Sequence, residues 1–260
     1  MSRTCTNSFT LWRSFQIILG WRVLAEKILQ TQGFGSKKFC QQLIKDGHVS
    51  FNGEICTQLK TQISTTNLSF SVYGEAFDYH EKVYIALNKA AGFECSHQTT
   101  HHHSVFSLFP DYLLNRGIQC VGRLDQDTTG LILFTDDGQF LQASTHPKKH
   151  VPKRYRMHTA DAINDEQINQ LRLGVELRNE QGIFAATEVQ QVDSHVLEMT
   201  IHQGIYHQVK RMLAAVGNKV EQLERVSIGQ LQLADLDLGE NEWRYLNADQ
   251  VQAAKMRDDV

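Results

Sequence analysis

Residues Val121–Gly138 read VGRLDQDTTGLILFTDDG and join a polar turn to an apolar segment. The run Leu131–Phe134 is continuously apolar, which is typical of a buried strand. Gly122 and Gly130 flank the polar turn that comes before this run. The stretch therefore predicts a loop of polar side chains that is fixed to a buried strand.

The polar turn carries one candidate site, formed by Arg123 and Asp125. Because they are two residues apart, they lie on the same side of an extended chain. A carboxylate beside a guanidinium stays ionised at neutral pH, as a nucleophile must be. A purely structural turn is the alternative, since Asp127, Thr128 and Thr129 can hydrogen-bond their own backbone. Residue chemistry alone leaves both interpretations open.

The region around this stretch, residues 83–252, alternates β-rich runs with a few helices. It begins with VYIALNKAAGF, which has the character of a strand. This alternation favours an α+β fold over a doubly wound parallel sheet. The polar segment 72–82, VYGEAFDYHEK, comes before it and is predicted to be a linker.

The region before the linker predicts a small unit of two helices and a hairpin. Residues 22–31 have a roughly helical spacing of apolar side chains. Ser36 is suited to cap a second helix over residues 36–46. Asn52-Gly53 predicts a tight turn between two extended segments. The second helix is expected to bury four side chains, those of Phe39, Cys40, Leu43 and Ile44.

Lys37 and Lys38 lie in the first turn of that second helix, where backbone N–H groups also face outward. A helix start with this charge predicts a phosphate-binding point. The net charge of the whole chain is −3, but residues 1–60 hold 8 basic against 3 acidic side chains, and residues 146–160 hold 5 against none. Clustered positive charge is what a nucleic-acid backbone requires, and an ordinary solvated surface is the alternative.

Composition narrows the class of protein. Of the 260 residues, 41% are hydrophobic and 21% are charged, which excludes wholesale disorder. No apolar run approaches the about 18 residues that span a bilayer, so no membrane partner is expected. The five cysteines contain no C-x-x-C, which favours a reduced cytoplasmic protein. His97 and His101–His103 are not expected to bind a metal, because adjacent side chains point in different directions.

Two stretches resemble known families. Arg22–Gly53, with GFGSKKFCQQLIKDGHVSFNG at its centre, resembles the S4 RNA-binding module. GRLDQDTTGLILFTDDG resembles the signature of the RsuA-type pseudouridine synthases, and the similarity runs through most of residues 83–246. The second resemblance implies that Asp125 is catalytic, that no cofactor or metal is needed, and that the catalytic domain is built on a mixed, mainly antiparallel sheet.

The two resemblances together imply an organisation in five parts. These are an N-terminal extension (1–20), an S4-like RNA-binding domain (21–71), the linker (72–82), the catalytic domain (83–252) and a C-terminal tail (253–260).

The motif Lys153-Arg154-Tyr155-Arg156 matches the strand that reads K-x-Y-x-V in this family. The resemblance implies that Tyr155 packs against the target base, since base–aromatic stacking stabilises such complexes. Lys153 and Arg154 are expected to bind RNA. A basic strand with one aromatic residue is the alternative interpretation.

The third motif lies in Gly204–Val216, GIYHQVKRMLAAV. Its apolar residues recur at helical spacing and are assigned to the core, whereas Lys210 and Arg211 fall outside that stripe. The resemblance implies that Lys210 pairs with Asp125 and that Arg211 binds RNA. A solvated lysine on a surface helix is the alternative.

The resemblance implies a cytoplasmic enzyme that isomerises one uridine of 16S ribosomal RNA, at the uridine-516 site, to pseudouridine. The sequence YHQVKRM favours the small subunit, because relatives acting on the large subunit more often read N-R-x-V-R-R-M/L. The substrate is expected to be this RNA or a small-subunit assembly intermediate, and the enzyme a monomer. The alternatives are a site in 23S ribosomal RNA and a non-catalytic, RNA-binding ribosome-assembly factor.

Overall fold

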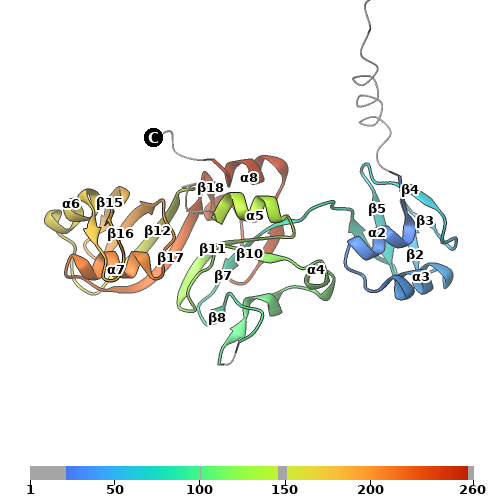
Figure 1. Ribbon diagram of the computed structural model, residues 1–260, viewed down its shortest axis with the longest axis horizontal. Helices are drawn as coiled ribbons and strands as arrows, with labels where there is room; N and C mark the ends of the chain where they lie inside the picture. The colour runs from blue at the N-terminus through green and yellow to red at the C-terminus, as the bar shows by residue number, and fades with distance from the viewer. Residues whose placement is uncertain (1–21, 100, 146–150, 257–260) are drawn as a thin grey trace, which may run out of the picture. The chain divides into compact units, whose positions relative to one another are not determined.

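The computed structural model describes residues 22–99, 101–145 and 151–256. The expected extension 1–20 lies outside these residues, as do part of the basic segment 146–160 and the end of the tail 253–260. The chain divides into two compact units (Figure 1). The first comprises the described residues up to Glu81 together with Pro110–Gly117, and the second comprises the rest.

The first unit combines short helices with two small sheets. Strands β3, β2, β5 and β6 form an antiparallel sheet in that order, and β1 pairs with β4. The elements are β1 (Arg22–Leu24), α2 (Ala25–Thr31), α3 (Lys37–Lys45), β2 (Val49–Phe51), β3 (Glu54–Ile55), β4 (Gln62–Ser64), β5 (Ser69–Val72), β6 (Glu75–Asp78) and α4 (Asp111–Asn115).

The expected cap and turn of this unit are present. The Ser36 hydroxyl accepts a hydrogen bond from the backbone N–H of Phe39 at 3.3 Å, which begins α3. Asn52 and Gly53 both have positive φ, 49° and 86°, and they connect β2 to β3. Two residues in the left-handed region match the right-handed twist of the paired strands, so the Asn-Gly signal correctly predicted the hairpin.

Three expectations for this unit need correction. The helix predicted over 22–31 begins at Ala25, because residues 22–24 pair with β4 as a strand. Phe39 is 49% exposed, because its ring turns back beside Gly35 and away from the buried side of α3. The expected linker 72–82 contains β6, whose pairing with β5 extends the sheet to Asp78.

The second unit is built on a nine-stranded sheet. Seven strands follow the order β15-β16-β12-β17-β11-β7-β19, while β10 pairs with β11 and β18 with β17. The pairing of β11 with β17 is parallel and the other pairings in this sheet are antiparallel. The expected α+β class with a mixed, mainly antiparallel sheet is therefore confirmed.

The strands of this unit are β7 (Tyr84–Lys89), β8 (Phe93–Glu94), β9 (His103–Ser104), β10 (Gln119–Val121), β11 (Thr128–Thr135), β12 (Lys153–Thr159), β13 (Val175–Glu176), β14 (Ile183–Phe184), β15 (Thr187–Asp193), β16 (Val196–Ile201), β17 (Val220–Ile228), β18 (Leu231–Gln232) and β19 (Trp243–Tyr245). Its helices are α5 (Gly138–Thr145), α6 (Asp165–Leu173), α7 (Gln208–Ala215) and α8 (Ala248–Ala253), with short 3-10 turns η1 (Val105–Leu108) and η3 (Leu233–Leu236). No helix in the described ranges has both the length and the apolar character that a bilayer crossing requires.

Strand β11 is buried on both faces, which explains its continuous apolar run. On one face Leu131 and Leu133 belong to the core that α5 and α8 complete, and Figure 1 shows these two helices on the same side of the sheet. On the other face Phe134 packs edge-on against Phe106 and Phe109, with ring centroids 5.5 and 4.7 Å apart. The loop that precedes β11 is thus attached to a rigid central strand.

Gly130 allows β11 to approach β17 closely. Its φ is +96°, and a Cβ at this position would lie 2.4 Å from the carbonyl oxygen of Arg225. Any larger residue would therefore separate the two strands. This approach brings the loop before β11 beside the Arg225 segment of β17.

Candidate active site

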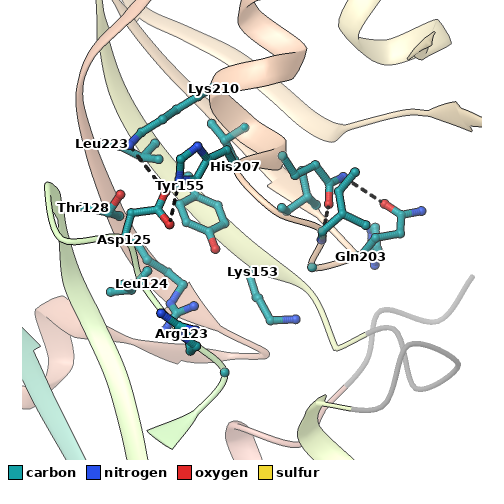
Figure 2. A pocket seen from close by; sticks show the side chains of 18 of the residues that line it. Arg123, Leu124, Asp125, Thr128, Lys153, Tyr155, Gln203, His207, Lys210 and Leu223 are labelled. Atoms are coloured by element: carbon teal, nitrogen blue, oxygen red, sulfur yellow. Dashed lines mark hydrogen bonds and ion pairs between the residues drawn. The ribbon is translucent and has the colours of Figure 1, made fainter. Parts of the chain in front are cut away.

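Asp125 lies in the loop between β10 and β11, where it lines a pocket of about 390 Å³. The pocket is enclosed by this loop, by strands β12 and β17 and by the start of α7. Figure 2 shows the side chains of Asp125, Tyr155 and His207 facing this space. Segments that are far apart in the sequence therefore meet around one carboxylate.

The loop that carries Asp125 is held in place by a buried lysine. Lys89 is fully buried, and its ammonium donates hydrogen bonds to four backbone carbonyls. The carbonyls and their distances from Nζ are those of Thr128 (2.7 Å), Asp125 (3.1 Å), Ala90 (3.1 Å) and Gln126 (3.3 Å). Burial lowers the pKa of Lys89, while nearby acidic groups oppose this effect. The ammonium fixes the backbone of the loop and leaves the Asp125 carboxylate free to face the pocket.

The Asp125 carboxylate lies between two groups from the start of α7. The His207 Nε2 atom is 3.3 Å from Asp125 Oδ1, and the Lys210 ammonium is 3.4 Å from Oδ2. His207 immediately precedes α7 and Lys210 lies in its first turn, so the start of this helix presents both of them to the carboxylate. The buried residues Val209, Met212 and Leu213 hold the opposite side of α7 in the core, as the spacing predicted.

Lys210 also contacts a second carboxylate, and more closely. Its Nζ lies 2.6 Å from Asp127 Oδ1. Burial raises the pKa of Asp127, but the hydrogen bond and charge of Lys210 outweigh burial and leave this pKa below its usual value. The expected proximity of Lys210 to Asp125 is therefore present, within a cluster of four side chains, Asp125, Asp127, His207 and Lys210, that the sequence did not predict.

Arg123 lines the same pocket but does not hold the carboxylate. Its side chain is exposed, and no ion pair within 4 Å joins Arg123 to Asp125 among the described residues. The guanidinium–carboxylate pair expected from the R-L-D spacing is therefore not formed. The loop turns at Asp125, whose carbonyl accepts a hydrogen bond from Thr128 N–H at 3.1 Å, so the chain is not extended there.

The basic motif on β12 is divided between the two faces of the sheet. Lys153 and Tyr155 line the pocket, and Tyr155 is 92% buried with its ring beside the Asp125 loop (Figure 2). Arg154 points to the opposite face, where its guanidinium pairs with Glu198 at 2.9 Å and with Glu188 at 3.1 Å. Alternation along a strand accounts for this division. The structure thus brings Lys153 and Tyr155 to the site and leaves Arg154 away from it.

The pocket floor is positively charged. Arg225 is 99% buried on β17, and its Nε donates to the Leu131 carbonyl at 2.7 Å. Lys153 donates to the Val151 carbonyl at 2.9 Å. Burial, with a further contribution from the charge of Arg225, lowers the pKa of Lys153 to about 8. A neighbouring anion would reverse that shift, so the floor is suited to a negatively charged ligand.

Three buried polar atoms of pocket-lining residues have no hydrogen-bond partner within the described part of the chain. They are Thr128 Oγ1, Ser144 Oγ and Arg225 Nη2. Buried polar atoms in proteins are usually paired, so unpaired ones mark places that a ligand or water can satisfy. In the ranges that the structure covers, no group of three His, Cys, Asp or Glu side chains is placed to hold a metal ion.

The remaining predicted residues lie outside the pocket. Arg211 pairs with Glu180 at 3.0 Å and donates to the Tyr206 carbonyl at 3.2 Å, so it fixes the chain around α7. Lys37 and Lys38 are exposed on α3 in the first unit, and Lys37 lies 3.3 Å from Glu26. Their predicted contacts with RNA remain predictions.

Sequence reasoning missed three residues of the site, namely Lys89, His207 and Arg225. His207 had a usable signal, because it precedes Lys210 by three positions at the start of a predicted helix. The residue types of Lys89 and Arg225 gave no such signal, since a lysine or arginine in a strand is ordinarily exposed. The assembled site offers a carboxylate opposite an aromatic side chain, with cations around it. Such a site can accept a planar ring and act on it, or on an attached group, as a nucleophile or base.

Comparison with known proteins agrees with this chemistry. Residues 83–215 match the family model described as RNA pseudouridylate synthase, and residues 26–67 match that of the S4 domain. Ribosomal small subunit pseudouridine synthase A of Vibrio vulnificus is 37% identical over 83% of this chain and 92% of its own length. The uncharacterized RNA pseudouridine synthase YtzG of Bacillus subtilis is 35% identical over 87% of this chain and 95% of its own.

A solved structure is also similar to this chain. The structure described as a pseudouridylate synthase has a TM-score of 0.63 and 33% identity, and the match covers 89% of this chain and 99% of that one. The expected combination of an S4 domain with an RsuA-type catalytic domain is therefore confirmed. The chain belongs to the RNA pseudouridylate synthase family.

Proposed function

We propose that this enzyme converts one uridine of small-subunit (16S) ribosomal RNA to pseudouridine, at the uridine-516 site, and that Asp125 acts on the nucleotide. Relatives that are named for the ribosomal small subunit support the choice of RNA, among them those of Vibrio vulnificus and Escherichia coli, 37% and 34% identical. The observation that carries the proposal is the position of Asp125 and Tyr155 on the walls of one pocket.

The reaction breaks the N1–C1′ bond of uridine and forms a C5–C1′ bond. The C5 hydrogen leaves as a proton and N1 gains one, so atoms and electrons balance within the nucleotide. An isomerisation of this kind needs no oxidant, reductant or second substrate, which supports catalysis by side chains without a cofactor. The target base must first leave its stack, which costs a few kcal/mol and least where the RNA is already unpaired.

The pocket is suited to the roles that this reaction requires. Tyr155 offers its ring to the uracil, since stacking of a base on an aromatic side chain is worth about 1–3 kcal/mol. The carboxylate can act by attack on C1′, by attack on the base or by removing a sugar proton, and in each route it must be ionised. Lys210 and His207 stand beside Asp125, with the Lys210 ammonium 3.4 Å from Oδ2 and His207 Nε2 3.3 Å from Oδ1, so both can hold the carboxylate in place. Lys153, Arg123 and Arg225 supply positive charge for the phosphates.

The S4 domain has a separate role in this proposal. Its exposed basic residues, with Lys37 and Lys38 on α3, contribute affinity through the RNA backbone. The substrate is naked ribosomal RNA or a small-subunit assembly intermediate, and the enzyme works as a monomer in the cytoplasm, where ribosomes are assembled.

The decisive experiment maps pseudouridine across both ribosomal RNAs in cells that lack the protein. The proposal expects that one site in 16S RNA is lost, that the wild-type gene restores it, and that the Asp125→Asn gene does not. Loss of a 23S site instead would assign the enzyme to the large subunit. Unchanged maps of both RNAs would favour a non-catalytic assembly factor.

A further inference from the structure

Tyr206 is an exposed aromatic residue at the rim of the pocket. Its neighbours Ile205 and His207 both line the pocket, whereas Tyr206 is 75% exposed. One face of its ring stacks on the His207 imidazole, with centroids 3.8 Å apart and planes inclined by 19°. With one face covered, this exposure leaves the other face of the ring open to solvent.

The backbone around Tyr206 is held in position before any ligand arrives. The Arg211 guanidinium donates to the Tyr206 carbonyl at 3.2 Å and is itself anchored by Glu180 at 3.0 Å. The Gln208 side chain accepts a hydrogen bond from Ile205 N–H at 3.4 Å. A side chain with few rotatable bonds on a fixed backbone loses little entropy on binding, as a recognition surface requires.

The ring pair connects this open face to the catalytic carboxylate. His207, which covers the inner face of Tyr206, places Nε2 3.3 Å from Asp125 Oδ1. Tyr206 therefore covers a face of the same His207 ring whose Nε2 edge contacts Asp125. A group stacked on Tyr206 would lie next to Ile205 and His207, which line the pocket.

We propose that the outer face of Tyr206 is a subsite for the base of a nucleotide that flanks the target uridine. This inference rests on the proposed function, since it takes the pocket to hold the flipped uridine. Turning one nucleotide out of an RNA strand leaves its neighbours without a stacking partner on one side. An aromatic platform beside the pocket replaces that partner, and because every base has a π-face it does so with little sequence preference.

The test combines a substitution of Tyr206 in the protein with the removal of one base from the RNA. It uses the RNA fragment that carries the mapped target uridine. Half-saturating RNA concentrations are measured under single-turnover conditions for the wild type, Tyr206→Phe and Tyr206→Leu. Each enzyme is tested on intact RNA and on RNAs in which the nucleotide 5′ or 3′ of the target is abasic. Tyr206→Leu should raise the half-saturating concentration about 5- to 150-fold on intact RNA, while Tyr206→Phe should stay close to the wild type.

The abasic RNAs decide the matter. On one of these RNAs the three enzymes should have the same half-saturating concentration, because the base that Tyr206 contacts is missing. A matched control is Tyr73→Leu in the first unit, since Tyr73 is 66% exposed and its ring also lies against a histidine, His48, at 4.6 Å. Tyr73→Leu should change the half-saturating concentration by the same factor on intact and on abasic RNA. In a parallel measurement, 2-aminopurine at the contacted position should be quenched by the wild type and by Tyr206→Phe, but not by Tyr206→Leu.

The subsite would be overturned if Tyr206→Leu raised the half-saturating concentration equally on intact RNA and on both abasic RNAs. It would also be overturned if Tyr206→Leu left the half-saturating concentration on intact RNA unchanged. Failure of the proposed function gives a different result, in which the wild type forms no product on any 16S fragment. The subsite is then tested on whichever RNA the pseudouridine map identifies.

Discussion

His207 places Nε2 3.3 Å from Asp125 Oδ1 while its own backbone lies in the left-handed region, with φ 52° and ψ 31°. Among residues other than glycine, asparagine, aspartate and histidine adopt this conformation most often, and a non-glycine residue held there costs of order 1–3 kcal/mol. His207 immediately precedes α7, which carries Lys210. The turn at His207 thus brings both residues to the carboxylate.

The first prediction concerns Asp125 itself. Asp125→Asn keeps the shape of the side chain but removes the negative charge, so the variant should fold and bind RNA nearly as the wild type does. Its single-turnover rate should fall by at least about 10²- to 10⁴-fold, the scale of a lost base or nucleophile. Tritium release from C5-labelled uridine measures this rate directly, since C5 loses its hydrogen when it joins C1′. A rate above a tenth of the wild-type value would refute the assignment.

Lys210 should matter through its contact with Asp125 and not through its closer contact with Asp127. Lys210→Met leaves the Asp125 carboxylate without its ammonium partner, and kcat should fall roughly 10- to 100-fold with little change in KM. Lys210→Arg should recover part of the loss. Asp127→Asn is the matched control: it removes the negative charge 2.6 Å from Lys210 and should keep kcat within a few-fold of the wild type. The opposite ranking of these two variants would show that the Asp127 pair carries the effect.

His207 is predicted to position Asp125. His207→Asn suits the left-handed backbone but is too short to reach Oδ1, and His207→Gly relieves the strain and removes the ring. Both should lower kcat by roughly 2- to 12-fold, the value of one hydrogen bond, without a loss of thermal stability. Rate measurements with matched melting curves check this. If kcat falls only where the melting temperature falls, the role of His207 is structural.

Much of the fold was predictable because local patterns and burial agree there. Leu131–Phe134 is a continuous apolar run because β11 is covered on both faces, and Asn52-Gly53 forms the turn that its φ angles permit. Residues 22–24 were assigned to a helix because their spacing suits one. Their pairing with 62–64 depends on a segment about 40 residues away, which no local pattern contains.

The site was predictable only where its residues carry a motif. Asp125, Tyr155 and Lys210 were placed by resemblance, and the structure brings them to one pocket. Lys89 and Arg225 escaped prediction because their burial depends on how β7 and β17 meet β11 in the folded sheet. The expected Arg123–Asp125 pair failed because residues two apart share a side only in an extended chain, and the loop turns at Asp125.

Lys153 should titrate far below an ordinary lysine. Burial and the charge of Arg225 lower its pKa from 10.5 to about 8. Between these values the unfolded chain holds a proton that the folded protein lacks, so the contribution of this group to stability rises with pH across that window. NMR titration of reductively methylated protein measures the pKa, and the resonance that disappears in Lys153→Arg identifies the group.

The same titration tests whether Lys153 contacts RNA. A phosphate beside the ammonium favours its charged form, so adding the target fragment to the inactive Asp125→Asn variant should move the titration of Lys153 to higher pH. Arg225→Met should also raise this pKa, in the absence of RNA, because one neighbouring positive charge is removed. An unchanged titration in the RNA complex would exclude a phosphate contact for Lys153.

The two lysines of α3 should differ in their contribution to RNA binding. Lys38 is exposed and has no ion-pair partner in the described part of the chain, whereas Lys37 lies 3.3 Å from Glu26. Lys38→Gln should therefore weaken binding to a target fragment and to an unrelated RNA alike, since a backbone contact carries no sequence information. It should also reduce the slope of log affinity against log salt by about 0.7, the value for one phosphate contact on single-stranded RNA.

Lys37→Gln should change the slope less, because Glu26 competes with the phosphate for this ammonium. Glu26→Gln frees Lys37 and should increase both affinity and slope.

Salt titrations of the three variants, followed by mapping of the product, test these expectations. An unchanged slope for Lys38→Gln would mean that this lysine is only solvated surface, and modification of a different uridine would mean that the S4 domain reads RNA sequence or shape directly.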